Sequence, residues 1–237
     1  MITRVPGVYW PKDSMPVWRY LSFDKFVNFM MHREVQFTRA SLFTDQNELR
    51  LLEAPEGKPE MTEEQAAQVE QRIENLRSST FVSCWSLGAS ESYPLWKIYL
   101  GGSRSGVAIR STVGKLRASL ESSPTQYFDG GVQYRREVFD KNPTNEQLIC
   151  TKLEAYAYER EYRVFASFTR HLTPKTEGKS AFTPNAIPEP IDVASMLGFI
   201  YVSPFSSSWF EKTVKDTMTR LAPDLTVPIR KSKIRDQ

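Results

Sequence analysis

The 237-residue sequence has few residues suited to cross-linking or to zinc binding, with only two cysteines and two histidines. Cys84 and Cys150 cannot form the disulfide framework of a small secreted domain, and their wide separation does not match a zinc-binding motif. His32 and His171 are also too few for a histidine-rich metal site. We expect these four residues to be packed or exposed in the ordinary way, and we assign no metal ligand among them.

The sequence also lacks a long hydrophobic run. The apolar stretch at Met196–Val202 is much shorter than the ~20 residues that a membrane-spanning helix needs. Met1–Trp10 does not show the basic patch followed by an apolar stretch that is typical of a signal peptide. The sequence therefore predicts a cytoplasmic protein without a membrane partner.

The known phosphate-binding loops are missing as well. Gly101–Gly106 is rich in glycine, but it lacks the Gly-Lys-Ser/Thr ending and precedes an expected strand, so we interpret it as a turn. The formal net charge of +3 permits an anionic ligand without requiring one. The clearest basic run lies in residues 230–237, which we expect to form a solvated tail.

The residues that are present predict one globular domain spanning 1–237. Hydrophobic residues make up 40% of the chain, enough for a continuous core. Apolar spacing predicts helices at 23–32, 62–76, 95–100, 112–121, 148–156 and 209–221. It predicts strands at 35–38, 80–85, 106–110, 132–134, 162–168, 198–202 and 225–229. Because helices and strands do not alternate regularly, we expect an α+β fold with a mixed, largely antiparallel sheet and flanking helices.

Residues 53–78 differ from the rest of the chain in their polar and charged composition. Thr62 followed by Gln65 forms a capping-box pattern that would begin a charged helix with few apolar positions. We expect a helical insertion at the surface that packs along one narrow side.

The segment Tyr158–Arg163 has the most informative pattern of charges. If it enters the strand expected at 162–168, then Glu159, Glu161 and Arg163 share one face. Two carboxylates so close together repel each other unless a proton or a cation separates them. Glu161 and Arg163 would then form either a structural ion pair or part of a reactive site.

The order of three motifs resembles the arginine, serine, Glu-x-Glu class of ADP-ribosyltransferases. These motifs are Trp18-Arg19-Tyr20, Ser83-Cys84-Trp85-Ser86 and Glu159-x-Glu161. The resemblance implies an ADP-ribosyltransferase-like fold that uses NAD as substrate, with Arg19 on its phosphates, Ser83 bracing the site and Glu161 on the nicotinamide ribose. Trp85 or Tyr20 would stack on a ring of NAD, and Glu159 would orient the acceptor.

The chemistry suits these residue types. Breaking the nicotinamide glycosidic bond gives the ribose oxocarbenium character, which a nearby carboxylate stabilises. A planar guanidinium can hold a diphosphate by parallel hydrogen bonds.

A second resemblance extends from about Val17 to Arg170. The ordered blocks Trp18-Arg19-Tyr20, Ser83-x-Trp85, Trp96-x-x-Tyr99 and Tyr158-Glu-x-Glu-Tyr-Arg163 are similar to a large bacterial family known only as a domain of unknown function. This resemblance implies a bacterial or phage origin and no particular activity.

We therefore expect an enzyme that cleaves NAD and modifies a macromolecular acceptor, either protein or nucleic acid. A toxin or phage-defence effector with an antitoxin or other defence-system partner is the natural role for that class. Two alternatives remain open. Asp45 and Glu48 could join Lys152 and the paired glutamates in a magnesium site of a nuclease. The chain could also be a binding module for RNA or protein, without enzymatic activity.

Overall fold

The structure of the protein is a computed structural model, which describes residues 2–43, 45, 48–49, 62–136, 143–167 and 184–235. Its helices are α1 (Phe23–His32), α2 (Glu63–Ser79), α3 (Tyr93–Leu100), α4 (Val113–Ser119), α5 (Asn145–Ile149), α6 (Val193–Met196) and α7 (Phe210–Leu221), with 3-10 turns η1 (Ala40–Leu42) and η2 (Glu154–Glu159). Its strands are β1 (Ile2–Arg4), β2 (Pro16–Ser22), β3 (Glu34–Arg39), β4 (Thr80–Leu87), β5 (Gly106–Thr112), β6 (Tyr127–Gly131), β7 (Gln133–Arg135), β8 (Thr151–Leu153), β9 (Glu161–Ser167), β10 (Ala186–Pro190), β11 (Phe199–Val202) and β12 (Ile229–Lys231).

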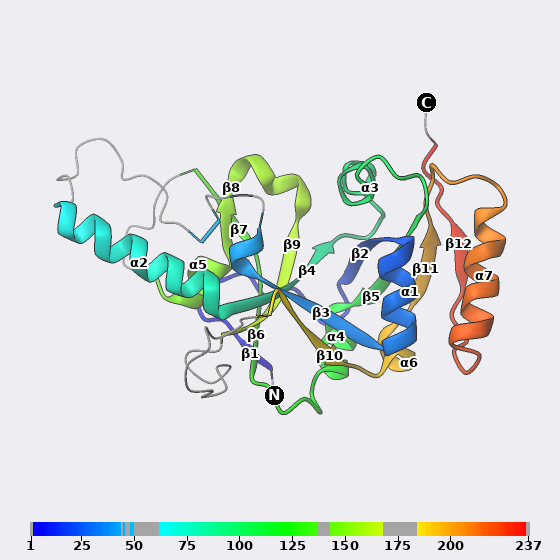
Figure 1. The fold of residues 1–237 in the computed structure, drawn as a ribbon, viewed down its shortest axis with the longest axis horizontal. Helices are drawn as coiled ribbons and strands as arrows, with labels where there is room; N and C mark the ends of the chain where they lie inside the picture. Colours follow the sequence, from blue (N-terminus) through cyan, green and yellow to red (C-terminus); the bar gives the residue numbers. More distant parts are fainter. Residues whose placement is uncertain are drawn as a thin grey trace, which may run out of the picture.

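A ten-stranded sheet organises the molecule and confirms the predicted mixed, largely antiparallel architecture. Its main path runs β1-β6-β9-β4-β2-β5-β11-β12, and the β3–β10 pair joins it at β4. The pairs β1–β6 and β11–β12 are parallel, whereas the central pairs are antiparallel. Strands from both ends of the described chain therefore belong to one sheet (Figure 1).

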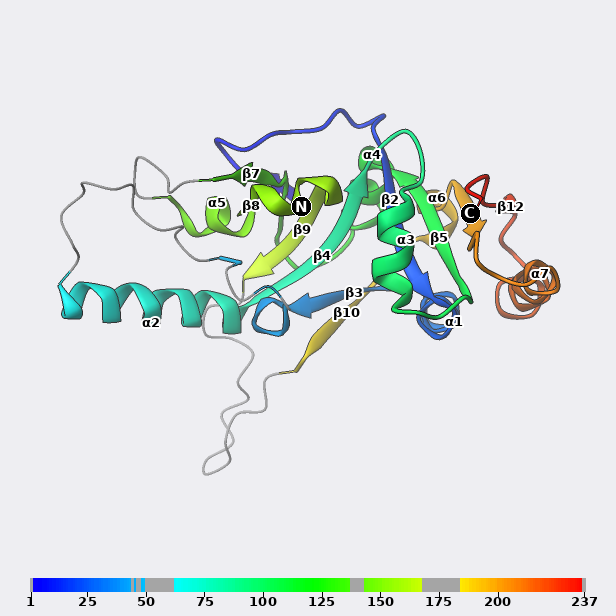
Figure 2. The same cartoon turned by 90° about the horizontal axis from the view of Figure 1, so that it is seen from above.

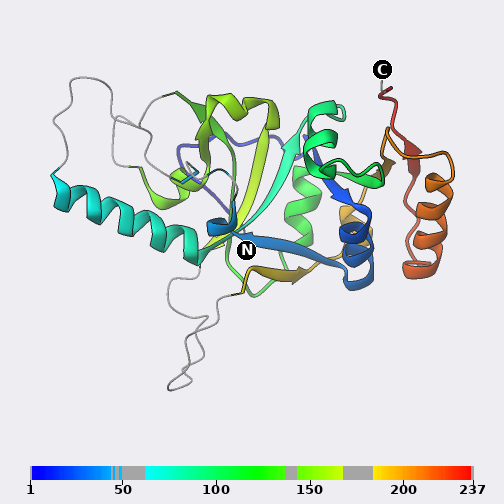
Figure 3. The same ribbon diagram turned by 45° about the horizontal axis from the view of Figure 1, so that its top comes forward.

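Helices pack on both faces of this sheet. Successive side chains of each strand project to opposite faces, and both faces carry apolar residues that must be covered. In β4, Phe81 and Trp85 join the largest core cluster, to which α1, α4, α6 and α7 contribute. The alternate residue Val82 packs into a second cluster, which includes Leu76 of α2 and Leu148 of α5. A third cluster lies under α3. Helices α2 and α7 lie at opposite ends of the molecule (Figures 2 and 3).

The helix α2 begins as its sequence predicts. The Thr62 side chain accepts from the Gln65 backbone N–H, and the Gln65 side chain accepts in return from the Thr62 N–H, at 3.2 and 3.0 Å. Only Ile73, Leu76 and Arg77 of this helix are buried. The first part of the expected insertion, 53–61, lies outside the described residues. None of the described helices has the length and apolarity needed to cross a bilayer.

Three expectations are wrong. The stripe at 148–156 is not one helix: α5 ends at Ile149 and the chain continues as β8 and η2. The last strand begins only at Ile229, the final residue of the segment 225–229 where we expected it. Consequently the basic residues Arg230 and Lys231 belong to β12, because they pair with β11, and are not part of a free tail.

Candidate functional site

A fork in the sheet creates the main cleft. At the start of β4, Phe81 and Val82 pair with β3, whereas at its end Ser86 and Leu87 pair with β2. The strands β2 and β3 therefore pair with different parts of β4 and diverge from each other near its middle (Figure 1). A cleft of about 470 Å³ opens at this fork, within the size range of ligand-binding pockets.

Arg19 spans the fork from β2. Its Nη1 donates to Ser83 Oγ on β4 at 2.6 Å, and its Nη2 donates to the Gln36 carbonyl on β3 at 3.0 Å. Its guanidinium carbon also lies 5.5 Å from the centre of the Trp85 ring. Burial lowers the pKa of Arg19 from its usual value. Arg19 lines the cleft, and three of the five N–H donors of its guanidinium remain for a ligand.

Ser83 supports Arg19 from behind the cleft. Its buried hydroxyl also accepts from Trp85 Nε1 at 3.1 Å. In β4–β9, Ser83 is opposite Val164 while Ser86 is opposite Glu161, so Ser83 and Glu161 project from opposite faces. Ser83 is not among the lining residues. It therefore acts on the cleft through the position that it gives Arg19.

The aromatic residues around Arg19 differ in accessibility. Trp85 and Tyr20 both line the cleft, yet their exposed fractions are only 2% and 4%. Tyr20 packs edge-on against Trp96, and its hydroxyl accepts from the Ser92 N–H at 2.7 Å. Tyr99, one helical turn beyond the fully buried Trp96, is 47% exposed and stacks on Tyr20 at 6.1 Å. The exposure of Tyr99 in the cleft makes its ring the better stacking platform.

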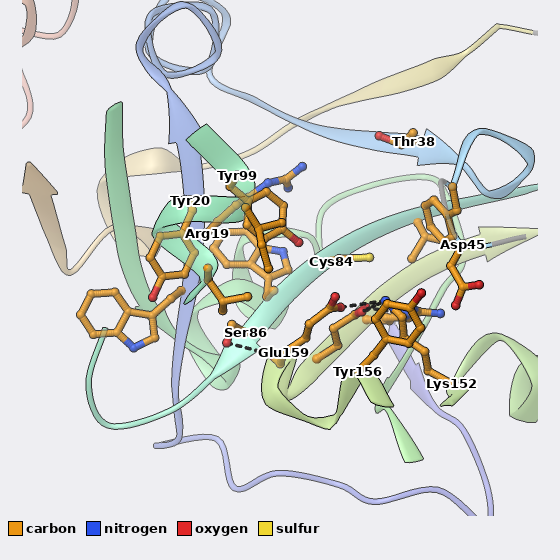
Figure 4. Close-up of a pocket in the computed structure, with 18 of the residues that line it drawn as sticks. Arg19, Tyr20, Thr38, Asp45, Cys84, Ser86, Tyr99, Lys152, Tyr156 and Glu159 are labelled. Atoms are coloured by element: carbon orange, nitrogen blue, oxygen red, sulfur yellow. Dashed lines mark hydrogen bonds and ion pairs between the residues drawn. The ribbon is translucent and has the colours of Figure 1, made fainter. Parts of the chain in front are cut away.

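The two glutamates reach the cleft by a sharp turn. Glu159 ends η2 and is not in the strand, so the predicted shared strand face is wrong for this residue. Between the glutamates, Arg160 adopts a left-handed conformation with φ of 46°, and its carbonyl accepts from the Leu87 N–H at 2.8 Å. The turn brings both carboxylates to one cation, Lys152 (Figure 4).

Lys152 is the centre of a buried ionic cluster. Its Nζ lies 2.7 Å from Glu159 Oε2, 2.9 Å from Glu161 Oε1 and 3.1 Å from Glu48 Oε1. Arg163 Nε binds the other oxygen of Glu161 at 2.7 Å, and Arg163 Nη2 pairs with Glu48. The Glu161–Arg163 ion pair considered in the sequence thus exists, but it shares a cluster with Glu48, Glu159 and Lys152.

The cluster shifts the pKa values of the two glutamates in opposite directions. Burial alone would raise the pKa of Glu161, but the positive charges of Arg163 and Lys152, with a hydrogen bond from Glu159, lower it below its usual value. Burial and the hydrogen bond to Glu161 raise the pKa of Glu159 to about 7. Glu159 is also the more accessible, with its side chain 14% exposed against 5% for Glu161. A carboxylate with a lowered pKa therefore lies beside one whose pKa of about 7 allows proton exchange near neutral pH.

The cleft brings these groups together from distant segments. Figure 4 shows Arg19 and Tyr99 on one side, Lys152, Tyr156 and Glu159 on the other, and Cys84 between them. Burial raises the pKa of the Cys84 thiol, which disfavours a thiolate nucleophile. The lining of the cleft also includes Lys25, Thr38, Asp45, Glu48, Ser86 and Glu161.

Of the carboxylates proposed for magnesium, Glu48, Glu159 and Glu161 converge, and Asp45 lines the same cleft. However, Lys152 and Arg163 occupy the space between the three glutamates, and within the described ranges no group of acidic, histidine or cysteine side chains is arranged to hold a metal ion. Protein cations therefore neutralise the three glutamates.

Comparison with known proteins gives a structural likeness only. No family model matches the chain, and no curated protein matches it. Among solved structures, Thermus sp. 2.9 DarT in complex with carba-NAD+ has 11% identity and a TM-score of 0.42, over 94% of this chain and 97% of that chain. Thermus sp. 2.9 DarT in complex with NAD+ has 12% identity and a TM-score of 0.39, over 94% and 98% of the two chains. Thermus sp. 2.9 DarT in complex with ADP-ribosylated ssDNA has 12% identity and a TM-score of 0.39, over 95% and 96%. At these identities and TM-scores, the likeness assigns no residue of this chain.

Proposed function

We propose that this protein is an ADP-ribosyltransferase that cleaves NAD in the cleft at the fork of the sheet and transfers ADP-ribose to a macromolecular acceptor. One observation carries the proposal: Arg19, with unused donors, and the paired carboxylates of Glu159 and Glu161 line one cleft although they come from distant segments. Ser83 of the serine motif does not line this cleft and would act by holding Arg19 through a hydrogen bond.

Arg19 would bind the diphosphate of NAD. Ser83 and the Gln36 carbonyl fix its guanidinium, so little side-chain entropy remains to be lost when a ligand binds. Lys25, exposed at the cleft lining, adds a second positive charge. Tyr99 offers an exposed ring on which a base of NAD can stack.

Glu161 would stabilise the positive charge that develops on the ribose as nicotinamide leaves. Its low proton affinity keeps it ionised at neutral pH, and burial in the cleft strengthens its field. Glu159, with a pKa raised to about 7, is suited to accept the proton of the attacking acceptor group. Ser86 positions Glu159 by donating to its backbone carbonyl at 2.8 Å.

The test is nicotinamide release from labelled NAD, with a cell extract as acceptor. Glu161→Gln preserves the shape but removes the charge, so kcat should fall by about 100-fold or more while NAD binding changes little. Normal release by a folded Glu161→Gln protein, or no release by the unmodified protein with any extract, would refute the proposal. We also propose that the protein acts in the cytoplasm as a toxin or defence effector. Identification of the acceptor would test this role.

A further inference from the structure

A second group of cations lies on another part of the sheet, at the end formed by β5, β11 and β12 (Figure 1). Arg110 of β5 is directly opposite Phe199 of β11, and Arg230 of β12 is directly opposite Tyr201 of β11. Because paired residues project to the same face, these four side chains share one face. We call this set the Phe199 surface.

Both arginines lie against the same aromatic ring. The guanidinium carbons of Arg110 and Arg230 are 5.5 and 4.2 Å from the centre of the Phe199 ring. Arg110 is also 5.5 Å from the ring of Trp18. Stacking on a ring holds a guanidinium in place but leaves the N–H groups at its edge available to an anion.

These arginines have no anionic partner in the part of the chain that the structure describes. Among the described residues, no carboxylate lies within salt-bridge distance of either arginine, and Arg110 Nε is buried without a hydrogen-bond partner. By contrast, the buried Arg163 binds two glutamates and Arg117 binds Asp129 at 2.6 Å. Glu91, which contacts the chain after β12, accepts from Trp96 Nε1 and the Lys233 N–H.

The positive charge continues along the chain after β12. Lys233 and Arg235 are exposed, and residues 229–235 contain no acidic residue. Lys231 differs, because its Nζ is held by oxygens of Ser203 and Ser206. Four cations therefore remain for a ligand: Arg110, Arg230, Lys233 and Arg235.

We propose that the Phe199 surface, with Lys233 and Arg235, binds the phosphate backbone of single-stranded nucleic acid. Guanidinium groups match phosphate oxygens, and the partly exposed ring of Tyr201 lies beside them for stacking with a base. A sheet face with adjacent aromatic and basic side chains suits a flexible strand better than a rigid duplex. This inference does not rest on the proposed function, since it uses neither Arg19 nor the paired glutamates.

The test is fluorescence anisotropy of the full chain with a labelled 20-nucleotide single strand, DNA and RNA in turn, across a range of salt concentrations. Arg110→Gln with Arg230→Gln should raise Kd at least tenfold. It should also reduce the slope of log Kd against log salt by about 1.4, because each lost phosphate contact on a single strand contributes about 0.7. The matched control, Lys12→Gln with Arg220→Gln, removes two exposed charges elsewhere and should leave Kd within about twofold and the slope unchanged.

Two further measurements distinguish binding by the arginines from an effect on folding or on the cleft. Since Arg110 is partly buried, Arg230→Gln alone, at an exposed position, should weaken binding in a protein with unchanged thermal unfolding. Glu161→Gln should bind the strand normally. Absence of binding by the unmodified protein, equal losses in the arginine and control variants, or equal affinity for a blunt duplex or for phosphatidylserine vesicles would overturn the proposal.

Discussion

Lys152 Nζ lies 2.7 Å from Glu159 Oε2 and at the same time 2.9 Å from Glu161 Oε1, so a single buried ammonium group binds both glutamates. Its own pKa is raised: burial would lower it, but the negative charges of Glu161 and Glu48 outweigh that effect. Lys152 therefore stays protonated, and the ionisation of the whole cluster depends on it.

Lys152→Met should strongly destabilise the protein at pH 8. The substitution leaves three buried carboxylates with Arg163 as their remaining cation, and removing one partner of a buried ion pair costs about 3–5 kcal/mol. The loss should be smaller at pH 5, where Glu159, whose pKa is raised to about 7, carries a proton and adds no negative charge. Urea unfolding at both pH values measures this difference. Lys215→Met, which breaks the exposed pair with Glu211, should cost less than about 0.5 kcal/mol and serves as the control.

Glu159→Gln should remove a pH dependence from both stability and activity. Because the pKa of Glu159 is raised to about 7 in the folded protein from its ordinary value of 4.5, the fold favours its protonated form. That contribution to stability is fully present below pH 4.5 and is lost as the pH rises towards 7. Glu159→Gln should therefore flatten unfolding free energy over this window, as measured by denaturant titration at several pH values.

The same variant tests the catalytic role. If Glu159 accepts the proton of the acceptor, kcat of the unmodified enzyme should rise with an apparent pKa of about 7, and this rise should be absent in Glu159→Gln. An identical pH profile in a folded Glu159→Gln protein would assign the proton transfer to another group.

Arg19→Lys should weaken NAD binding even though it keeps the positive charge. A lysine cannot donate to Ser83 Oγ and the Gln36 carbonyl and also present a planar edge to a diphosphate. We expect the Kd for NAD, measured by calorimetry, to increase about 10- to 100-fold, with Ser83→Ala giving a smaller change in the same direction. Arg33→Lys, in an exposed pair with Asp224, is the matched control and should leave NAD affinity unchanged.

The insertion should divide into a dispensable part and a part that belongs to the core. Leu76→Ala removes a buried side chain and should lower the unfolding free energy by about 2–5 kcal/mol, whereas the exposed Glu74→Ala should change it by less than about 0.5 kcal/mol. Replacing 53–70 by a short Gly/Ser linker should preserve a cooperative thermal transition. Loss of cooperativity in that deletion would show that the first turns of α2 also stabilise the core.

Local patterns in the sequence determined many of the elements. The apolar spacing of α1, the capping box of Thr62 and Gln65, and the alternation of Tyr162, Val164 and Ala166 in β9 are short-range properties, and the structure has each of them. Such patterns succeed because helix and strand periods act over a few residues. The same reasoning was wrong at 148–156, where tertiary pairing of β8 with β7 and the 3-10 turn η2 replaced the expected helix.

The sequence by itself also determined which residue types are available for chemistry: one arginine among aromatics, a serine-rich strand end and two alternating glutamates. Only the tertiary structure decided their relations. The separation of β2 and β3 along β4 places Arg19 across the fork, and the left-handed turn at Arg160 aims both glutamates at Lys152. The same packing placed Ser83 behind Arg19 and left Tyr99 exposed. These outcomes depend on contacts between residues far apart in the chain, which local periodicity does not specify.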